Sequence, residues 1–143
     1  MLFKRVSRSA PEVVYLVALN VSGGVLTAGY SAVFDTGASA DGIRVTQATT
    51  AALNSFAGVA DSDIANSAYG LLQVYGYRAS AYVYTSTGSS VGGDILGTVN
   101  AEWGLTPSAS AGVAKAFGFL CEAVAASTSS RFHTTAKVFL RGL

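Results

Sequence analysis

The residues whose types could do chemistry gather first at positions 32–39, which read AVFDTGAS. Asp35 ends an apolar run, and Thr36 and Gly37 follow it. Peptide hydrolysis by such a carboxylate requires a second carboxylate about 3 Å away, so that the pair shares one proton. The chain has a single Asp-Thr-Gly, so a catalytic Asp35 would need the Asp35 of a second copy.

This arrangement resembles the retroviral type of aspartic protease, which acts as a homodimer. The DILG at 94–97 resembles the element beneath the catalytic carboxylate in that family. Between the two motifs, however, SFAGVADSD has one glycine where the family has a glycine-rich flap, and 46 residues follow Gly97. A strand that exits into a turn has the same pattern, because Asp and Gly supply the local hydrogen bond and the turn conformation. We favour that reading, and expect Asp35 to bond local backbone or lie in solvent.

The other residue types that commonly act in catalysis or metal binding, histidine and cysteine, each occur once. His133 is the only histidine and Cys121 the only cysteine, so no zinc set, Ser-His-Asp triad or disulfide can be proposed. We expect His133 to be structural, and Cys121, in the apolar run AFGFLCEAV, to be a small core residue. Trp103 is expected in the core, with a sugar-stacking platform as the alternative. The chain is predicted to be no enzyme and to hold no cofactor or metal.

The composition indicates a single domain that lives in an assembly. Of 143 residues, 50% are apolar and 12% charged, which excludes a disordered chain and predicts a surface rich in small and apolar groups. The net charge of +1 gives no case for binding nucleic acid. The charge is uneven, because Lys4, Arg5 and Arg8 fall in the first ten residues. We predict a basic arm over 1–12 and one β-rich domain over 13–143.

No apolar run approaches the ~18–20 residues of a membrane span. The stretch VVYLVAL at 13–19 is too short, and has the wrong flanks, for a secretion signal. We therefore expect a protein of intracellular origin with no membrane partner.

Short segments rich in Val, Tyr, Phe, Leu and Thr alternate with Gly, Ser and Asp clusters, which is typical of an all-β protein. So many short strands in one small domain predict a mainly β fold, a single small β-barrel or β-sandwich with long loops. The stretch at 49–69 is less clear, and a helical turn could occupy 62–68. We predict strands at 13–20, 30–35, 43–48, 70–84, 94–101, 115–125 and 134–141.

The predicted strand at 70–84 carries apolar bulk on both faces. Gly76 in its middle indicates a bend or a close backbone approach. Tyr75 and Tyr77 share one face by the two-residue period of a strand. They either cap the core with exposed hydroxyls or lie on a protein interface.

From residue 25 onward, a succession of pieces resembles the head decoration, or capsid cement, proteins of tailed bacteriophages and their small β-barrel relatives. The pieces are AGYSAVF, RVT, FAGVA, GLLQVYG, GGDILGTVNAEWGL and AFGFLCEAVAAST…AKVFLRGL. In this resemblance Asp35 lies at a strand-to-loop exit and Asp94 in the turn that enters the next strand.

The resemblance implies a structural virion protein on the outer surface of the capsid. Such a protein binds the major capsid protein, stabilises contacts between capsomers against internal DNA pressure, and acts as a homo-oligomer, a trimer or dimer. The residues expected to contact capsid or subunits are Lys4, Arg5, Arg8, Tyr75 and Tyr77. The alternatives are the homodimeric protease with Asp35, a tail or connector component, and a glycan-binding β-domain.

Overall fold

The computed structural model describes residues 2–3, 12–85, 89–107, 116–125 and 132–142. Strands and loops account for these residues, and no helix occurs among them. The mainly β class is therefore confirmed. The described strands, all in one hydrogen-bonded sheet, are β1 (Leu2–Phe3), β2 (Val14–Asn20), β3 (Ser31–Phe34), β4 (Arg44–Thr46), β5 (Phe56–Ala60), β6 (Tyr69–Thr85), β7 (Ile95–Thr98), β8 (Leu105–Pro107), β9 (Gly118–Leu120) and β10 (Phe132–Arg141).

Three of these strands were not predicted: β1, β5 and β8. The helical turn expected at 62–68 is wrong, because Ile64 instead forms a β-bridge with Leu26. The segment predicted at 115–125 is much shorter in its described part: β9 stops at Leu120, and Cys121 follows it as an exposed residue. The expectation of a buried Cys121 is therefore wrong, because Cys121 lies just after the end of β9 and is exposed instead of packing in the core.

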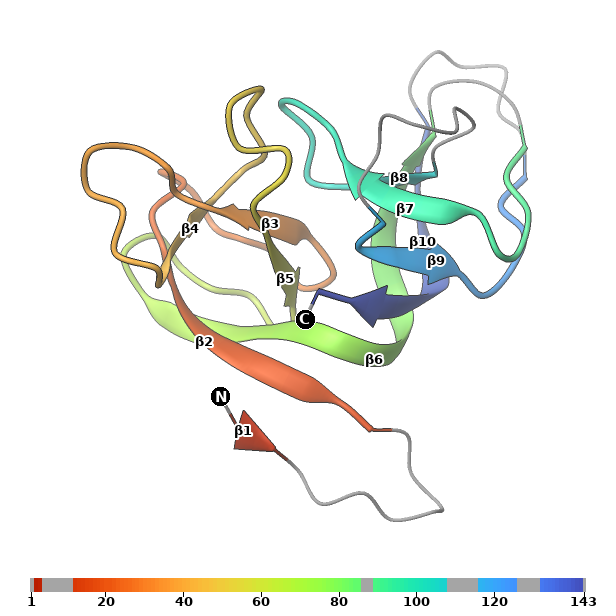
Figure 1. Cartoon of the computed structure of the whole chain (residues 1–143), viewed down its shortest axis with the longest axis horizontal. Helices are drawn as coiled ribbons and strands as arrows, with labels where there is room; N and C mark the ends of the chain where they lie inside the picture. The colour runs from red at the N-terminus through yellow and green to blue at the C-terminus, as the bar shows by residue number, and fades with distance from the viewer. Residues whose placement is uncertain (1, 4–11, 86–88, 108–115, 126–131, 143) are drawn as a thin grey trace.

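The long strand β6 organises the sheet, which closes two rings within the described residues. One ring runs β2-β4-β3-β5-β6 and returns to β2; the other runs β6-β8-β7-β9-β10 and returns to β6. The first uses β6 up to Tyr75, and the second uses it from Tyr75 onward. Figure 1 shows the two groups of strands side by side, with β6 running along the bottom and then turning upward into the second group.

The two rings have the same topology. In each, the first strand pairs with the third in parallel, and the remaining neighbours are antiparallel. We call the β2–β6 ring repeat 1 and the β6–β10 ring repeat 2. The shared strand β6 is the last strand of repeat 1 and the first of repeat 2.

The register of the strands matches as well. Ser31 opposes Val59 in repeat 1, and Ile95 opposes Phe119 in repeat 2. Val59 in turn opposes Gln73, and Phe119 opposes Phe139. The same correspondence relates two isolated bridges, Leu26–Ile64 and Ser90–Val124, and two turn contacts in which Gly29 and Gly93 donate to Ala60 and Leu120, each at 2.8 Å. Each repeat is therefore a copy of one supersecondary unit.

Each repeat encloses a buried apolar cluster. The cluster inside repeat 1 includes Ala18, Ala32, Val45, Ala60 and Leu72. The cluster inside repeat 2 occupies the equivalent positions with Ala81, Leu96, Leu105, Leu120 and Val138. Burial of this apolar surface is the main term that stabilises both rings.

Gly76 marks the place where β6 passes from one repeat to the next. Its φ is +101°, a conformation that L side chains rarely adopt. A Cβ at this position would collide with the carbonyl oxygen of Glu12. The bend expected from this mid-strand glycine is thus a real feature of the fold. The buried Gln73 amide supports it by donating to the carbonyls of Tyr75, Gly76 and Tyr77 at 3.3, 3.2 and 3.1 Å.

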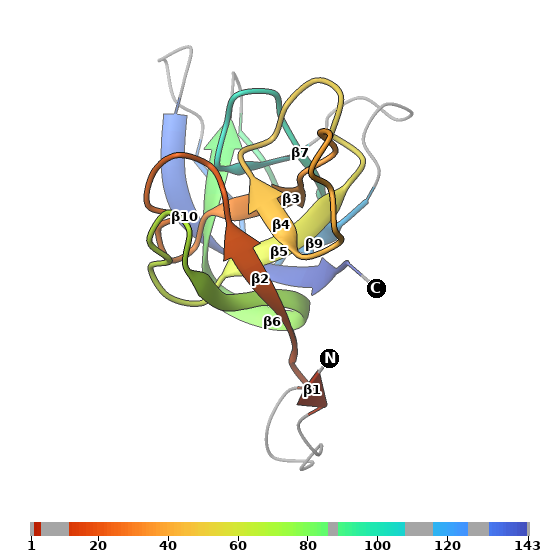
Figure 2. The same ribbon diagram turned by 90° about the vertical axis from the view of Figure 1, so that its left-hand side faces the viewer.

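At the N-terminus, β1 pairs antiparallel with β2, through Leu2 with Tyr15 and Phe3 with Val14. Figure 2 shows β1 alongside the outer end of β2, away from the two rings. The basic residues Lys4, Arg5 and Arg8 lie outside the described part of the chain.

Candidate interaction surface

Asp35 follows the end of β3, and its carboxylate serves the local turn. Oδ1 accepts a hydrogen bond from the backbone N–H of Gly37 at 3.0 Å, and Oδ2 lies 3.6 Å from Nε of Arg44. The expectation that Asp35 bonds local backbone is confirmed. Asp94 behaves in the same way before β7, where Oδ2 accepts from the N–H of Val91 at 2.9 Å. Both motifs that suggested chemistry are therefore turns that enter or leave a strand.

His133 and Trp103 lie in a chain of partly buried aromatic rings at one end of β6. Trp103 stacks on Tyr30, with ring centroids 5.7 Å apart, and Tyr30 lies 4.8 Å from Tyr82. The ring of His133 stacks on Tyr82 at 5.2 Å, and its Nε2 is 3.8 Å from Glu102. Burial, followed by the charges of Tyr30 and Glu102, raises the pKa of Tyr82. These rings join the repeats to each other, since Trp103 belongs to repeat 2 and Tyr30 to repeat 1.

Cys121 is a free, exposed cysteine beside Glu122. Partial burial and the neighbouring Glu122 carboxylate raise its pKa, which disfavours the thiolate. Across the described residues, no three His, Cys, Asp or Glu side chains group so that they could hold a metal ion. The same residues include no helix long and apolar enough to cross a membrane.

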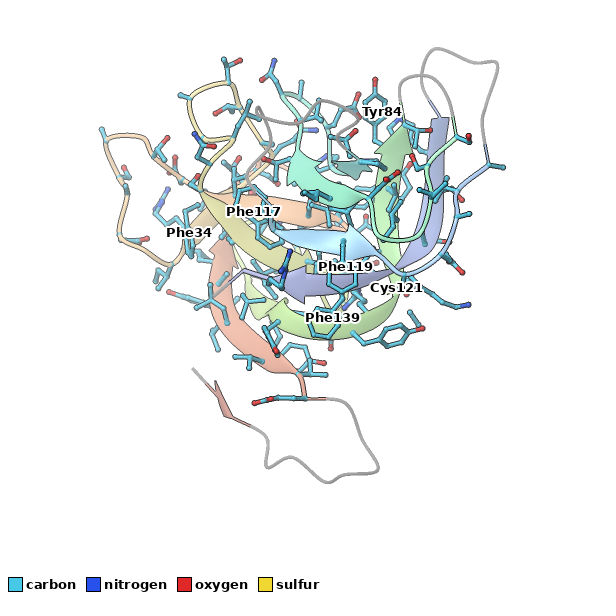
Figure 3. The ribbon with its side chains drawn as sticks, turned by 45° about the vertical axis from the view of Figure 1, so that its right-hand side comes forward. Phe34, Tyr84, Phe117, Phe119, Cys121 and Phe139 are labelled. Carbon is cyan, nitrogen blue, oxygen red and sulfur yellow. The ribbon has the colours of Figure 1, made fainter. Side chains whose placement is uncertain are left out.

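A row of large side chains crosses the outer side of repeat 2. Tyr77 of β6 opposes Phe139 of β10, Phe139 opposes Phe119 of β9, and Phe119 opposes Ile95 of β7. The rings of Phe119 and Phe139 stack with centroids 5.4 Å apart. Figure 3 shows these two rings next to each other over the outer side of their strands. Directly opposed side chains on one face form the stabilising unit of a sheet, so this row is a preformed ridge.

Two further residues widen the ridge. Tyr75 packs edge-on against Phe139 at 5.4 Å, and the Arg141 guanidinium lies 5.5 Å from the centre of the Phe119 ring. We define the repeat 2 face as these six residues: Tyr75, Tyr77, Ile95, Phe119, Phe139 and Arg141. Aromatic residues and arginine are enriched at the centres of protein interfaces. This face therefore has residue types that protein interfaces favour.

The face is also partly exposed. Ile95 is 44% exposed and Tyr77 is 37% exposed, and the two phenylalanines between them are half-buried. Residues on either side of the row along the strands, such as Leu96, Leu120 and Leu140, are buried inside repeat 2. The alternation is that of a sheet with one face on the core and the other turned outward.

Of the predicted contact residues, Tyr75 and Tyr77 are thus brought together on one face. Lys4, Arg5 and Arg8 fall outside the described residues. Phe119, Phe139 and Ile95 were missed. The alternation of Phe119 with the buried Gly118 and Leu120 would have indicated an outward aromatic, had the strand been placed over three residues instead of eleven.

Repeat 1 carries an apolar cavity of about 210 Å³. Its walls come from β2, β3, β5 and β6, with Gly142 after the end of β10, and include Leu16, Phe34, Phe56, Ala57 and Val74. At the rim lies Tyr15, whose pKa is raised by burial and by the neighbouring Asp61 carboxylate. Such an apolar hollow provides a socket for an apolar side chain.

With the fold and these surfaces established, comparison with known proteins adds one finding. No protein-family model and no curated protein matches the chain. Among solved structures, the N base of the head fiber gp8.5 in bacteriophage phi29 is similar, with a TM-score of 0.54 and 17% sequence identity. The similarity covers 91% of this chain and 95% of that chain. At this identity the likeness shows that the two share a fold.

Proposed function

We propose that this chain is a structural component of a bacteriophage virion that binds the outer surface of the head and stabilises contacts between capsomers. The observation that carries the proposal is the fold shared, over nearly the whole of both chains, with a head fiber base. The resemblance of residues 25–143 to head decoration proteins supports the same assignment from the sequence.

The composition suits such a role. Only 12% of the residues are charged, and several large apolar side chains are exposed on the described surface, including Val17, Tyr69 and Ile95. Broad contacts of this kind are weak one at a time. On a capsid lattice they act together, because a protein that bridges two subunits binds the second at a high effective concentration.

The basic arm is the proposed strap onto the capsid. Lys4, Arg5 and Arg8 carry +3 on a chain whose remainder has six basic and eight acidic groups. An acidic patch on the major capsid protein would attract this arm, and the attraction would weaken as the salt concentration rises.

The repeat 2 face, with Tyr75 and Tyr77, is the proposed site of contact with another protein subunit, either the capsid or a further copy in a homo-oligomer. Its stacked rings and Arg141 are groups that protein interfaces favour.

Binding to heads tests the function directly. Expanded heads assembled without this protein are mixed with the purified chain and sedimented, with and without residues 1–9. We expect the full chain to sediment with the heads, and the shortened chain to remain in the supernatant. Unchanged sedimentation of the shortened chain would rule out the strap.

A second function, favoured by the same comparison, is that of a base that carries a further virion component on the head. The two are distinguished by the stability of the heads. A stabilising protein raises the temperature at which the heads release DNA, whereas a base for another component binds without changing that temperature.

A further inference from the structure

Equivalent outer faces of the two repeats differ in how deeply they are buried. In repeat 1 the row Ser31, Val59 and Gln73 is buried, with 2%, 0% and 3% exposure. The equivalent row in repeat 2 is Ile95, Phe119 and Phe139, in which Ile95 is 44% exposed. Equivalent positions in the same fold differ because something covers the first row, and no described residue of the chain covers the second to the same extent.

Repeat 2 itself covers the repeat 1 row. Val59 and Phe56 belong to the apolar cluster inside repeat 2, and the Phe56 ring stacks on Phe117 with centroids 4.9 Å apart. The carbonyl of Trp103 accepts hydrogen bonds from the backbone N–H and the hydroxyl of Ser31, both at 2.8 Å. The internal contact thus joins the outer face of one repeat to a side of the next that includes Phe117 and Trp103.

That covering side has its own equivalent in repeat 1, where buried residues line a cavity. Ala57 corresponds to Phe117 and Val74 to Leu140, and both line the apolar cavity of about 210 Å³. Ile43, two residues before Val45, corresponds to Trp103, two residues before Leu105. Ile43 is 38% exposed. The covered row of repeat 1 therefore recurs in repeat 2 with Ile95 exposed, and the covering side of repeat 2 recurs in repeat 1 as an apolar cavity beside the exposed Ile43.

We propose that a second copy of this chain packs the cavity and Ile43 of its repeat 1 against the repeat 2 face of the first copy, repeating the internal contact between chains. The internal contact supplies the docking geometry, in which Ile43 of one copy lies near Ile95 of the next. Phe119 then faces the cavity, as Val59 faces the interior of repeat 2.

The side-chain sizes at the two ends are complementary. The repeat 2 face has Phe119 where repeat 1 has the smaller Val59. The receiving side has Ala57 where repeat 2 has the larger Phe117. A larger group on the inserting surface thus meets a smaller one in the socket, which preserves dense packing at the contact.

An interface between two different surfaces is heterologous, and it closes into a ring if the rotation between copies allows. Each copy then has two different binding surfaces: the repeat 2 face, which we call the donor surface, and the cavity with Ile43, which we call the acceptor surface. This property separates the proposal from a face that pairs with itself, and it does not depend on binding to a capsid.

The test uses the full-length chain and two variants, each blocking one surface. Ile95→Asp places a charge on the donor surface, and Ile43→Asp places one on the acceptor surface. Val25→Asp is the matched control, because Val25 is 55% exposed and belongs to neither surface. Mass is measured by sedimentation equilibrium, and thermal unfolding of each variant establishes that it is folded.

We expect the wild type and Val25→Asp to exceed the monomer mass of 14.5 kDa, and each blocked variant to be monomeric. An equimolar mixture of the two blocked variants forms a dimer and nothing larger, because one intact donor meets one intact acceptor. A monomeric wild type would overturn the proposal, as would a self-associating Ile43→Asp variant beside a monomeric Ile95→Asp variant. A monomeric wild type whose binding to heads is lost in Ile95→Asp would assign the face to the capsid instead.

Cross-linking gives a second readout that does not depend on destabilising the interface. Cysteines are introduced as Ile43→Cys and Ile95→Cys in a Cys121→Ser background and treated with a short bismaleimide. We expect covalent oligomers only when both cysteines are present in the mixture. Products from Ile95→Cys alone would show that the face pairs with itself and would contradict the proposal.

Discussion

Val59 and Phe119 occupy equivalent positions in the two repeats, yet Val59 is fully buried and Phe119 is partly exposed. The difference comes from the order of the repeats in the chain, because repeat 2 follows repeat 1 and packs on the face that holds Val59. Among the described residues, none covers Phe119 as fully as repeat 2 covers Val59. The proposed contact between two copies would cover Phe119 in the same way.

Because β6 bends at Gly76, we expect the addition of a single methyl group at this position to lower the stability of the protein strongly. Gly76→Ala must place an L residue at φ +101° and force the new Cβ against the carbonyl of Glu12. We expect the free energy of unfolding to fall by about 2–4 kcal/mol, measured by urea denaturation. Gly93→Ala is the control, since φ is +99° there and no atom lies within 4 Å of the added Cβ. A Gly93→Ala loss as large as that of Gly76→Ala would show that the Glu12 contact is unimportant.

We expect a similar loss of unfolding free energy when the amide of Asn20 is replaced by a carboxylate. Its amide is fully buried and donates to the carbonyls of Gly24 and Ile64, both at 2.8 Å. Asn20→Asp has the same shape but turns an acceptor toward both carbonyls, and should lower the free energy of unfolding by about 3 kcal/mol.

The control for that substitution is Asn66→Asp. The side chain of Asn66 accepts from the N–H of Gly23 at 3.0 Å in an exposed setting, and a carboxylate keeps that bond. Both variants are followed by thermal unfolding at neutral pH. Equal melting temperatures for the two would contradict the role assigned to the Asn20 amide.

Asp35 is expected to affect stability by two small and separable amounts. Asp35→Asn keeps an acceptor for the N–H of Gly37 and loses the ion pair with Arg44, at a cost below about 1 kcal/mol because the pair is partly exposed. Asp35→Ala also loses the turn hydrogen bond and should cost about 1 kcal/mol more. Urea denaturation measures both. Peptide cleavage by the wild type that disappears in Asp35→Asn would instead establish the protease alternative.

Glu122 ties the end of β9 to β10 and makes stability depend on pH. Its Oε1 accepts from the backbone N–H of Lys137 at 2.8 Å, and its Oε2 lies 3.1 Å from Nζ of Lys137. The N–H bond first, and the Lys137 side chain second, lower the pKa of Glu122 below 4.5. A lowered folded-state pKa stabilises the protein above the unfolded value, and the effect is lost as the pH falls through the folded value.

Melting temperatures from neutral to acid pH test this dependence. The wild type should melt above Glu122→Gln at neutral pH, and the difference should shrink as the pH falls below 4.5. Lys137→Gln keeps the backbone N–H and should lose less than Glu122→Gln. A gap that is constant across this range would mean that the charge of Glu122 has no part in the tie.

The sequence predicts most of the strands because their apolar residues alternate or form runs between turn residues. It does not predict β5, because every residue of Phe56–Ala60 is buried and the segment has no alternation. It does not predict β8, because three residues ending in Pro107 give too short a pattern. The turn at Asp35 was predicted correctly, since an Asp two residues before a Gly is a local signal.

The internal repeat could not be predicted, because equivalent positions hold different kinds of residue. Ser31 corresponds to Ile95, and Gln73 to Phe139. Their chemistry follows what each one faces, a neighbouring repeat or the outside, and this depends on contacts between residues distant in the chain. Tyr75 and Tyr77 were singled out by residue type and by the shared face that the two-residue period of a strand gives them. The face to which they belong emerges only when β9 and β10 lie beside β6.

The central claim is that this chain binds the outside of a phage head, and imaging decorated heads tests it most directly. Expanded heads assembled without the protein are incubated with the purified chain and imaged by cryo-electron microscopy. The account predicts new density on the outer surface at joints between capsomers, into which the two-ring sheet fits. Heads whose outer surface is unchanged at saturating protein would contradict it.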